Sequence, residues 1–142
     1  MFETDTEAVA AVWYRAGIEA YPYLAGWRDM TPELALAVFR SHIAARCKVF
    51  VAEQGATIAG FLALQGSYVD RLYVDPSRQR RGLGRALIAR ARELSPAGLE
   101  LHTHQQNESG RRFYEALGFV AVRFGISPPP ESAPDVEYHW RP

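Results

Sequence analysis

The length and apolar content of the sequence indicate a single domain over residues 1–142, because this is enough chain for one core and 48% of it is apolar. A formal net charge of zero gives neither nucleic acid nor an anionic membrane a reason to bind, and a single cysteine excludes an internal disulfide. No apolar run is long enough to cross a bilayer, and the acidic N-terminus lacks a signal-peptide pattern, so the cytoplasm is the default location.

The N-terminal segment is predicted to be a helix followed by an aromatic loop. Residues 4–7 match a capping box, and apolar residues then recur at helical spacing. The loop that follows contains Tyr21, Tyr23 and Trp27. These aromatic residues either plug one end of the core or line a pocket; for Trp27 the core is favoured.

A second helix is predicted from Thr31 and Pro32, an N-cap and an N1 residue, to about Arg46. His42 lies near its apolar face and is expected to be a partly buried structural histidine. The residues expected to face inward are Leu34, Ala35, Val38 and Phe39.

The rest of the chain alternates between predicted strands and helices. Short turns join the first three strands, which favours an antiparallel meander, and a helix from Gly82 returns the chain to a fourth strand parallel to the third. The exposed loop at residues 125–134 separates the last two strands. The predicted strands are residues 48–53, 57–64, 68–74, 99–103, 120–124 and 135–140.

A glycine loop connects the third strand to this helix. Its sequence is Gln79-Arg80-Arg81-Gly82-Leu83-Gly84, followed by a strongly helical run. The first turn of a helix has unpaired N–H groups and a positive dipole end, and glycines let an anion approach them. The loop is therefore a candidate phosphate site, weighed against an ordinary turn in which the glycines only satisfy the backbone.

A second motif follows the fourth strand. Asn107 precedes a predicted helix that carries Phe113, Tyr114 and Glu115 and ends in Leu117-Gly118-Phe119, where a glycine is expected at the helix end. With the Gln-x-x-Gly-x-Gly loop before it, this motif resembles the GCN5-related N-acetyltransferases. The resemblance extends over roughly residues 4–140, and its strong motifs occupy residues 68–119.

The resemblance implies an α/β fold, α+β in some schemes: a central, mixed, mostly antiparallel sheet of six or seven strands with about four helices. Two parallel strands, here Tyr68–Val74 and residues 99–103, would splay apart. Relatives have a full strand before the first helix, whereas only residues 1–3 are available here, so that strand is expected to be very short or missing.

The resemblance also implies that acetyl-coenzyme A is the co-substrate, with its pyrophosphate on the glycine loop and its pantetheine arm along the third strand. No metal is expected. The implied coenzyme-binding residues are Leu72, Tyr73, Val74, Gln79, Arg80, Arg81, Gly82, Leu83, Gly84, Arg85, Asn107 and Tyr114.

By the same resemblance Tyr114 is the general acid, whereas the general base is left open. Many relatives have a carboxylate at the position of Tyr68, and Tyr68 is itself expected to be a catalytic residue here. Asp70 is one substitute, although a salt bridge to a neighbouring arginine is its competing role. Other candidate bases are Glu53, His102 and His104. Residues expected to bind the acceptor are Tyr21, Tyr23, Tyr68 and His102.

The predicted function is transfer of an acetyl group from acetyl-coenzyme A to a primary amine of a small molecule or peptide, by direct attack in a ternary complex; a homodimer is an open alternative to a monomer. The main competing hypothesis is a non-catalytic coenzyme A sensor or scaffold. A nucleic-acid-binding domain built on Arg78, Arg80, Arg81 and Arg85 is disfavoured by the zero net charge.

Overall fold

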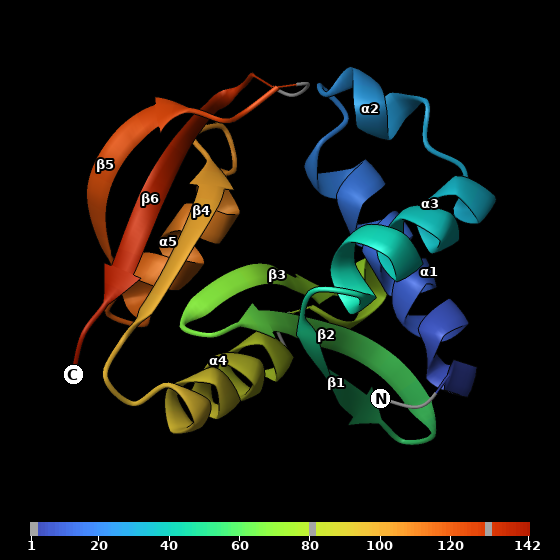
Figure 1. Cartoon of the computed structure of the whole chain (residues 1–142), viewed down its shortest axis with the longest axis horizontal. Coiled ribbons are helices and arrows are strands. Elements are labelled where there is room, and N and C mark those ends of the chain that lie inside the picture. Colours follow the sequence, from blue (N-terminus) through green and yellow to red (C-terminus); the bar gives the residue numbers. More distant parts are fainter. Residues whose placement is uncertain (1–2, 80–81, 130–131) are drawn as a thin grey trace.

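The computed structural model describes residues 3–79, 82–129 and 132–142. It contains one six-stranded sheet in the order β1-β2-β3-β4-β6-β5 (Figure 1). Every predicted strand is present, with ends that differ by at most two residues. The strands are β1 (Lys48–Gln54), β2 (Thr57–Gln65), β3 (Tyr68–Val74), β4 (Leu99–His104), β5 (Val120–Ile126) and β6 (Pro134–Trp140).

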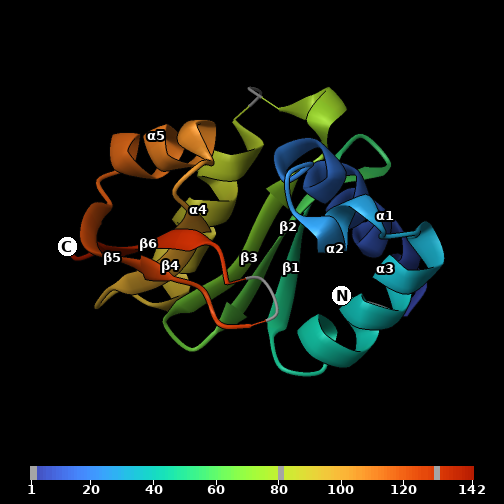
Figure 2. The same cartoon turned by 90° about the horizontal axis from the view of Figure 1, so that it is seen from above.

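Helices cover both faces of the sheet. Figure 2 shows α4 and α5 on one side of the strands and α1 to α3 on the other. Among the described residues no helix is both long and apolar enough to span a membrane. The helices are α1 (Glu3–Ala20), α2 (Ala25–Arg28), α3 (Pro32–Val38), the π-helical turn η1 (Phe39–Ala44), the 3-10 turn η2 (Pro76–Arg78), α4 (Leu83–Leu94) and α5 (Glu108–Ala116).

Strand β2 divides the interior into two cores. Side chains alternate across a strand, so Leu62 and Leu64 face α4 while Phe61 and Ala63 face α1 and α3. All four are at most 6% exposed, as expected for a central strand covered on both faces. Burying each of the larger side chains contributes roughly 1.5–3 kcal/mol. This packing fixes β3, the next strand in the sheet, in position.

The parallel strands β3 and β4 diverge soon after they start. Their register contains one pair, Tyr68 with Glu100, beside a hydrogen bond that the Glu100 N–H donates to the Ser67 carbonyl at 3.0 Å. Strand β4 then pairs with β6 over all six of its residues. The sheet therefore opens between β3 and β4 (Figure 1), as the family resemblance implies.

The N-terminal prediction needs one correction. Helix α1 already includes Glu3, so Thr4 lies within the helix and the capping box does not mark its start. Residues 1–2, the remainder of the expected short strand, lie outside the described residues. The aromatic loop also differs from expectation, because the short helix α2 occupies part of it.

The second helix is also less regular than predicted. Thr31 caps it as expected, its Oγ1 accepting from the Leu34 N–H at 3.1 Å. However, α3 ends at Val38 and the chain continues as a π-helical turn. Because the wider turn presents Ile43 to the core, His42 is exposed, with its Nδ1 2.7 Å from Ser41 Oγ. Leu34 is 47% exposed, so its predicted inward position is wrong.

Candidate active site

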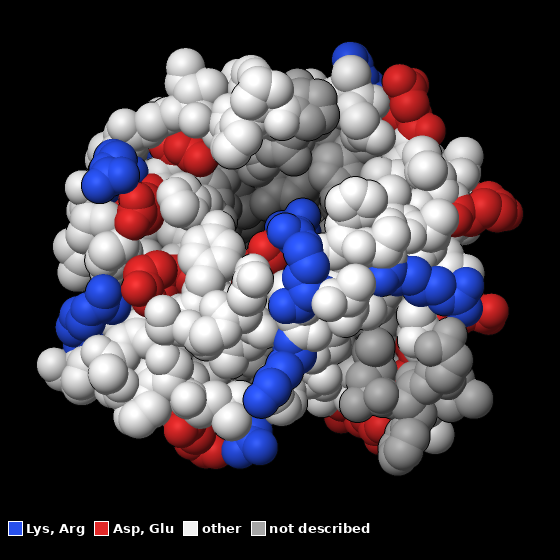
Figure 3. Space-filling model, in the orientation of Figure 1, with Lys and Arg blue, Asp and Glu red and all other residues white. Residues whose placement is uncertain are grey.

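A cleft of about 1940 Å³ lies where β3 and β4 separate. Figure 3, drawn in the orientation of Figure 1, shows a hollow in the surface with basic and acidic side chains near its border. The cleft brings together most of the site residues expected from the sequence: Tyr21, Tyr68, Asp70, Leu72, Tyr73, Val74, Gln79, Gly82, Leu83, Gly84, Arg85, His102, Asn107 and Tyr114. Arg80 and Arg81 lie outside the described residues.

The N-terminus of α4 forms one end of the cleft. Gly82 precedes the helix with φ 81°, a left-handed conformation that favours glycine. The N–H groups of the first helical turn have no acceptor within the helix, and the helix dipole adds positive charge there. Gln79 donates from Nε2 to the Val74 carbonyl at 3.2 Å, which ties the loop to the end of β3. This end of the cleft is chemically suited to a phosphate group.

Gly84 has a packing role that the sequence did not reveal. A Cβ on this residue would lie 3.0 Å from Cζ and 3.1 Å from Cε1 of Phe113 on α5. The glycine therefore allows α4 and α5 to approach each other. A Gly84→Val change would disturb this contact as well as any bound anion, so it is a poor test of coenzyme binding alone.

The free edge of β3 runs along the cleft. Beyond the pair of Tyr68 with Glu100, β3 has no strand partner on its β4 side among the described residues. On its other side, the register with β2 shifts between Ala63 and Leu64, as at a β-bulge. Bulges often lie next to active sites, where they redirect side chains. The edge leaves backbone groups at residues 72–74 available to an extended ligand.

Four tyrosines gather around the centre of the cleft: Tyr21, Tyr68, Tyr73 and Tyr114. Burial raises the pKa of Tyr114 well above its usual value, and the nearby phenols of Tyr21 and Tyr68 raise it further. Burial likewise raises the pKa of Tyr73, with smaller contributions that include a hydrogen bond to Tyr21. Burial raises the pKa of Tyr68 as well. The phenols of Tyr68, Tyr73 and Tyr114 therefore stay protonated at neutral pH and can donate hydrogen bonds.

Asn107 caps α5 and joins it to the tyrosine group. Its Oδ1 accepts from the Gly110 N–H at 3.1 Å, and its Nδ2 donates to Thr103 Oγ1 at 3.1 Å and to Tyr21 Oη at 3.5 Å. These contacts fix the direction in which α5 leaves β4, and so the position of Tyr114. Asn107 thus has a structural role that requires no ligand, and its contact with the coenzyme stays a prediction.

The candidate bases occupy different surroundings. Asp70 Oδ2 accepts from Arg71 Nη1 at 3.2 Å, which is the salt bridge weighed against catalysis. Tyr68 Oη lies 2.9 Å from His102 Nδ1. The His104 ring packs edge-on against Tyr21, at 4.8 Å between centroids. Glu53 is exposed on β1 and does not line the cleft. His102 is thus the histidine directly connected to Tyr68.

Tyr23 is not among the residues that line the cleft. Its ring packs edge-on against Tyr21 at 6.0 Å and against His104 at 6.2 Å, and 38% of the residue is exposed. Tyr21, on which Tyr23 packs, does line the cleft; it is 8% exposed and its ring stacks on Trp27. Contact between Tyr23 and an acceptor stays a prediction.

Glu137 is a cleft residue that the sequence analysis missed. It alternates along β6 with Val136 and Tyr138, both fully buried, so the two-residue period of a strand was the available signal. The pairing of β6 with β4 places Glu137 opposite His102. No three His, Cys, Asp or Glu side chains in the described ranges are arranged to hold a metal ion.

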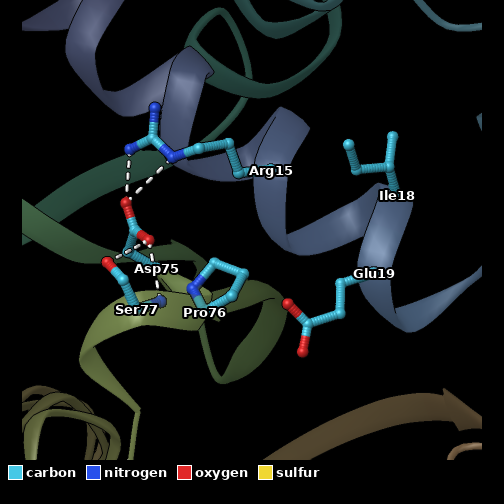
Figure 4. A pocket seen from close by; sticks show the side chains of 6 residues that line it. All are labelled: Arg15, Ile18, Glu19, Asp75, Pro76 and Ser77. Carbon is cyan, nitrogen blue, oxygen red and sulfur yellow. Dashed lines mark hydrogen bonds and ion pairs between the residues drawn. The ribbon is translucent and has the colours of Figure 1, made fainter.

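A second pocket of about 690 Å³ lies near the end of β3 (Figure 4). Here Asp75 accepts from Arg15 Nε at 2.9 Å and from the Ser77 N–H and Oγ at 3.1 and 2.9 Å. Burial raises the pKa of Asp75, but the hydrogen bonds and charge from Arg15 and Ser77 outweigh it, so the pKa is lowered. This ion pair joins α1 to the end of β3 and has a structural role.

Comparisons with known proteins agree with this geometry. The acetyltransferase (GNAT) domain family matches residues 45–121. Peptidyl-lysine N-acetyltransferase YiaC of Escherichia coli (strain K12) is 27% identical over 122 residues, covering 84% of this chain and 80% of YiaC.

Two solved structures are similar in fold. The solution structure of apo YjaB from Escherichia coli has a TM-score of 0.79 at 23% identity, covering 96% of this chain and 91% of YjaB. The PaiA N-acetyltransferase of Thermoplasma acidophilum, solved in complex with coenzyme A, has a TM-score of 0.72 at 19% identity, covering 98% of this chain and 94% of PaiA.

Proposed function

Since the chain belongs to the acetyltransferase (GNAT) family, whose members use acetyl-coenzyme A, we propose that it acetylates a primary amine by direct attack in a ternary complex. The observation that carries the proposal is the separation of β3 from β4 after a single pair, with the N-terminus of α4 at one end of the opening. That arrangement offers a long donor both a backbone edge and an anion site.

The donor would lie along this opening. Its pyrophosphate would accept hydrogen bonds from the N–H groups at the start of α4, close to Gly82 and the Arg85 side chain, both of which line the cleft. Its pantetheine arm would pair with β3 at Leu72 and Val74, in the place that a further strand would take. The thioester would then lie near the tyrosine group.

The chemistry requires two proton movements. The amine nitrogen forms a bond to the thioester carbon and loses a proton, the carbon–sulfur bond breaks, and the departing thiolate takes a proton. We assign that donation to Tyr114, which burial keeps protonated. Because its pKa lies above the ~8.5 of a thiol, complete transfer is uphill, and a hydrogen bond to the developing thiolate supplies much of the stabilisation. A backbone N–H of β3 would polarise the carbonyl.

The acceptor side favours an amine on an apolar stem. Tyr21 and Trp27 form an aromatic wall, and the carboxylates of Asp70, Asp135 and Glu137 also line the cleft. A lysine side chain combines a four-carbon stem with an ammonium group, so it suits both features. YiaC, a relative over most of the chain, acts on peptidyl-lysine. We therefore propose a lysine side chain of a peptide as the preferred acceptor, and a small-molecule amine as the second candidate.

The test is release of free coenzyme A thiol from acetyl-coenzyme A, measured across lysine peptides with blocked N-termini and a panel of small amines. Burial raises the pKa of the Cys47 thiol, which slows its own reaction with the thiol reagent, and a reaction without acceptor corrects for the remainder. Amine-dependent thiol release with an acetylated product is expected. Coenzyme A binding with no turnover of any amine would favour the competing sensor or scaffold.

We also propose a domain organisation, a surface for self-association and a cellular location. Residues 1–142 would act as one domain, since both cores include residues of β2. Self-association would involve the sheet edge at β5, where Val120, Phe124 and Ile126 are 58–70% exposed. A cytoplasmic location is the third.

A further inference from the structure

Three side chains from neighbouring strands form a connected line on one face of the sheet. Tyr68 on β3 reaches His102 on β4, with 2.9 Å between Oη and Nδ1. The other ring nitrogen of His102, Nε2, lies 3.6 Å from Oε1 of Glu137 on β6. All three residues line the cleft. The line begins at Tyr68, beside the one register pair that joins β3 to β4.

Glu137 is held as a carboxylate by its neighbours. Its Oε2 is 2.6 Å from His139 Nε2, and its Oε1 is 3.6 Å from Arg123 Nη1. The hydrogen bond from His139 lowers the pKa of Glu137 most; burial opposes it, and the positive charge of Arg123 lowers the pKa further. A negative charge therefore stands next to His102 Nε2 at neutral pH.

This arrangement assigns the protons along the line. The carboxylate favours a proton on His102 Nε2, which leaves Nδ1 as an acceptor for the Tyr68 hydroxyl. Burial raises the pKa of Tyr68, as do the charges of Asp70, Asp135 and Glu137, while Arg71 lowers it. Tyr68 is accordingly a protonated phenol that donates to His102.

We propose that Tyr68, His102 and Glu137 form the proton relay that deprotonates the acceptor amine, in place of the single carboxylate base of many relatives. The proposal rests on the proposed function, because it gives the base that the acetyl transfer requires. Tyr68 would be the member that touches the amine. His102 and Glu137 would act through it, as an imidazole and its carboxylate do behind a nucleophile.

The proton balance is complete for an acceptor that reacts as the neutral amine, the proton of its ammonium form having first passed to water. As the amine nitrogen bonds to the thioester carbon, it gives its proton to Tyr68 Oη, while the Tyr68 proton passes to His102 Nδ1. The resulting imidazolium is stabilised by the Glu137 carboxylate. The carbon–sulfur bond breaks, and the thiolate takes the proton of Tyr114. His102 then loses a proton to water and Tyr114 regains one, which restores the resting state.

Different phenols thus serve the two reacting groups, Tyr68 the amine and Tyr114 the thiolate. Tyr68 and Tyr114 both line the cleft. Tyr68 is backed by a histidine that accepts its proton, whereas Tyr114 packs against Phe113, Phe119 and Tyr138. One phenol is placed to pass a proton onward and the other to donate one.

The variants that test the relay are Tyr68→Phe, His102→Gln and Glu137→Gln, together with the double variant Tyr68→Phe/His102→Gln. His42→Gln is the control, because His42 is exposed on η1 and does not line the cleft. Each variant is assayed with acetyl-coenzyme A and a blocked lysine peptide as a function of pH, and its affinity for coenzyme A is measured by calorimetry.

His102→Gln should lower kcat by about 10²–10³-fold, within the usual range for a general base. Coenzyme A affinity should stay within about twofold, since the relay does not contact the nucleotide end. Tyr68→Phe should lower kcat by a similar factor. The double variant should lose no more kcat than either single variant, because the effects of residues that act as a unit are not additive. Glu137→Gln should lower kcat by less than His102→Gln does, because the imidazolium formed during the reaction loses its counter-charge.

A second measurement needs no acceptor. Nitrogen-15 spectra of the histidine rings should show neutral His102 protonated on Nε2, and Glu137→Gln should increase the share of the tautomer that is protonated on Nδ1. A normal kcat in His102→Gln would overturn the relay while leaving the proposed function intact. Multiplying losses in the double variant, or a proton on Nδ1, would also overturn it. A wild-type chain that neither binds coenzyme A nor acetylates any amine would overturn the relay and the proposed function together.

Discussion

Gly17→Ala should destabilise the protein, although helix propensity alone predicts the reverse. Gly17 lies in the interior of α1, where alanine is favoured over glycine by about 1 kcal/mol. A Cβ there would be 2.2 Å from Cη2, 2.3 Å from Cζ3 and 2.4 Å from Cζ2 of Trp27. Contacts between carbons are normally about 3.5–4.0 Å, so the indole would have to move by more than about 1 Å.

The indole has little freedom to move. Its ring lies 5.0 Å from that of Trp13, edge to face, and 6.5 Å from that of Tyr21. Overpacking of this kind costs about 1–3 kcal/mol, and a three-atom clash belongs at the upper end. Subtracting the propensity gain leaves a net loss of about 1–2 kcal/mol. Because Trp27 lines the cleft, the acceptor KM should rise as well.

Urea unfolding measures the change directly. With a slope of about 2 kcal/mol/M, the midpoint should fall by about 0.5–1 M. Gly26→Ala is the matched control, because Gly26 lies in α2 and a Cβ there meets nothing within 4 Å. Its midpoint should stay the same or rise slightly. A higher midpoint for Gly17→Ala would refute the packing argument and leave helix propensity as the deciding effect.

Three further outcomes are expected. Tyr114→Phe should lower kcat by about 10²–10⁴-fold with coenzyme A affinity nearly unchanged, and a surviving kcat with chemistry shown to be rate-limiting would remove it as the acid. Tyr23→Ala should raise the acceptor KM more than the acetyl-coenzyme A KM; equal rises would place the residue elsewhere. Asp75→Asn should lower stability at neutral pH and flatten its decline in acid. Because Arg15 and Ser77 lower the folded-state pKa of Asp75, its contribution is present above the unfolded pKa of ~3.9 and lost as the pH falls through the folded pKa. An acid-side slope identical to that of the wild type would contradict that last assignment.

Local patterns predicted most of the fold. The strands have a clear two-residue period or a β-rich composition between turn residues, and the two motifs lie where a strand meets a helix, at positions fixed by their glycines and by Asn107. Short turns between the first three strands and a helix before the fourth were enough to set their directions.

The errors have physical causes that a local pattern does not contain. The π-helical turn at Phe39–Ala44 changes the helical register around His42, which is exposed, so its placement was wrong. Leu34 precedes that turn, in α3, and is exposed as well. The contact of Gly84 with Phe113 and the line from His102 to Glu137 depend on how α5 and β6 pack onto residues far away in sequence. Such contacts follow from register and helix docking, which a local sequence pattern does not reveal.

The most direct test of the central claim is a titration of the labelled protein with coenzyme A, followed through its backbone amide signals. The account predicts that the largest shifts fall at residues 82–85, at the start of α4, and at residues 72–74, along the free edge of β3. Pantetheine alone should retain the second set and lose the first. Shifts confined to the pocket beside Arg15 and Asp75, or the absence of saturable shifts, would contradict it.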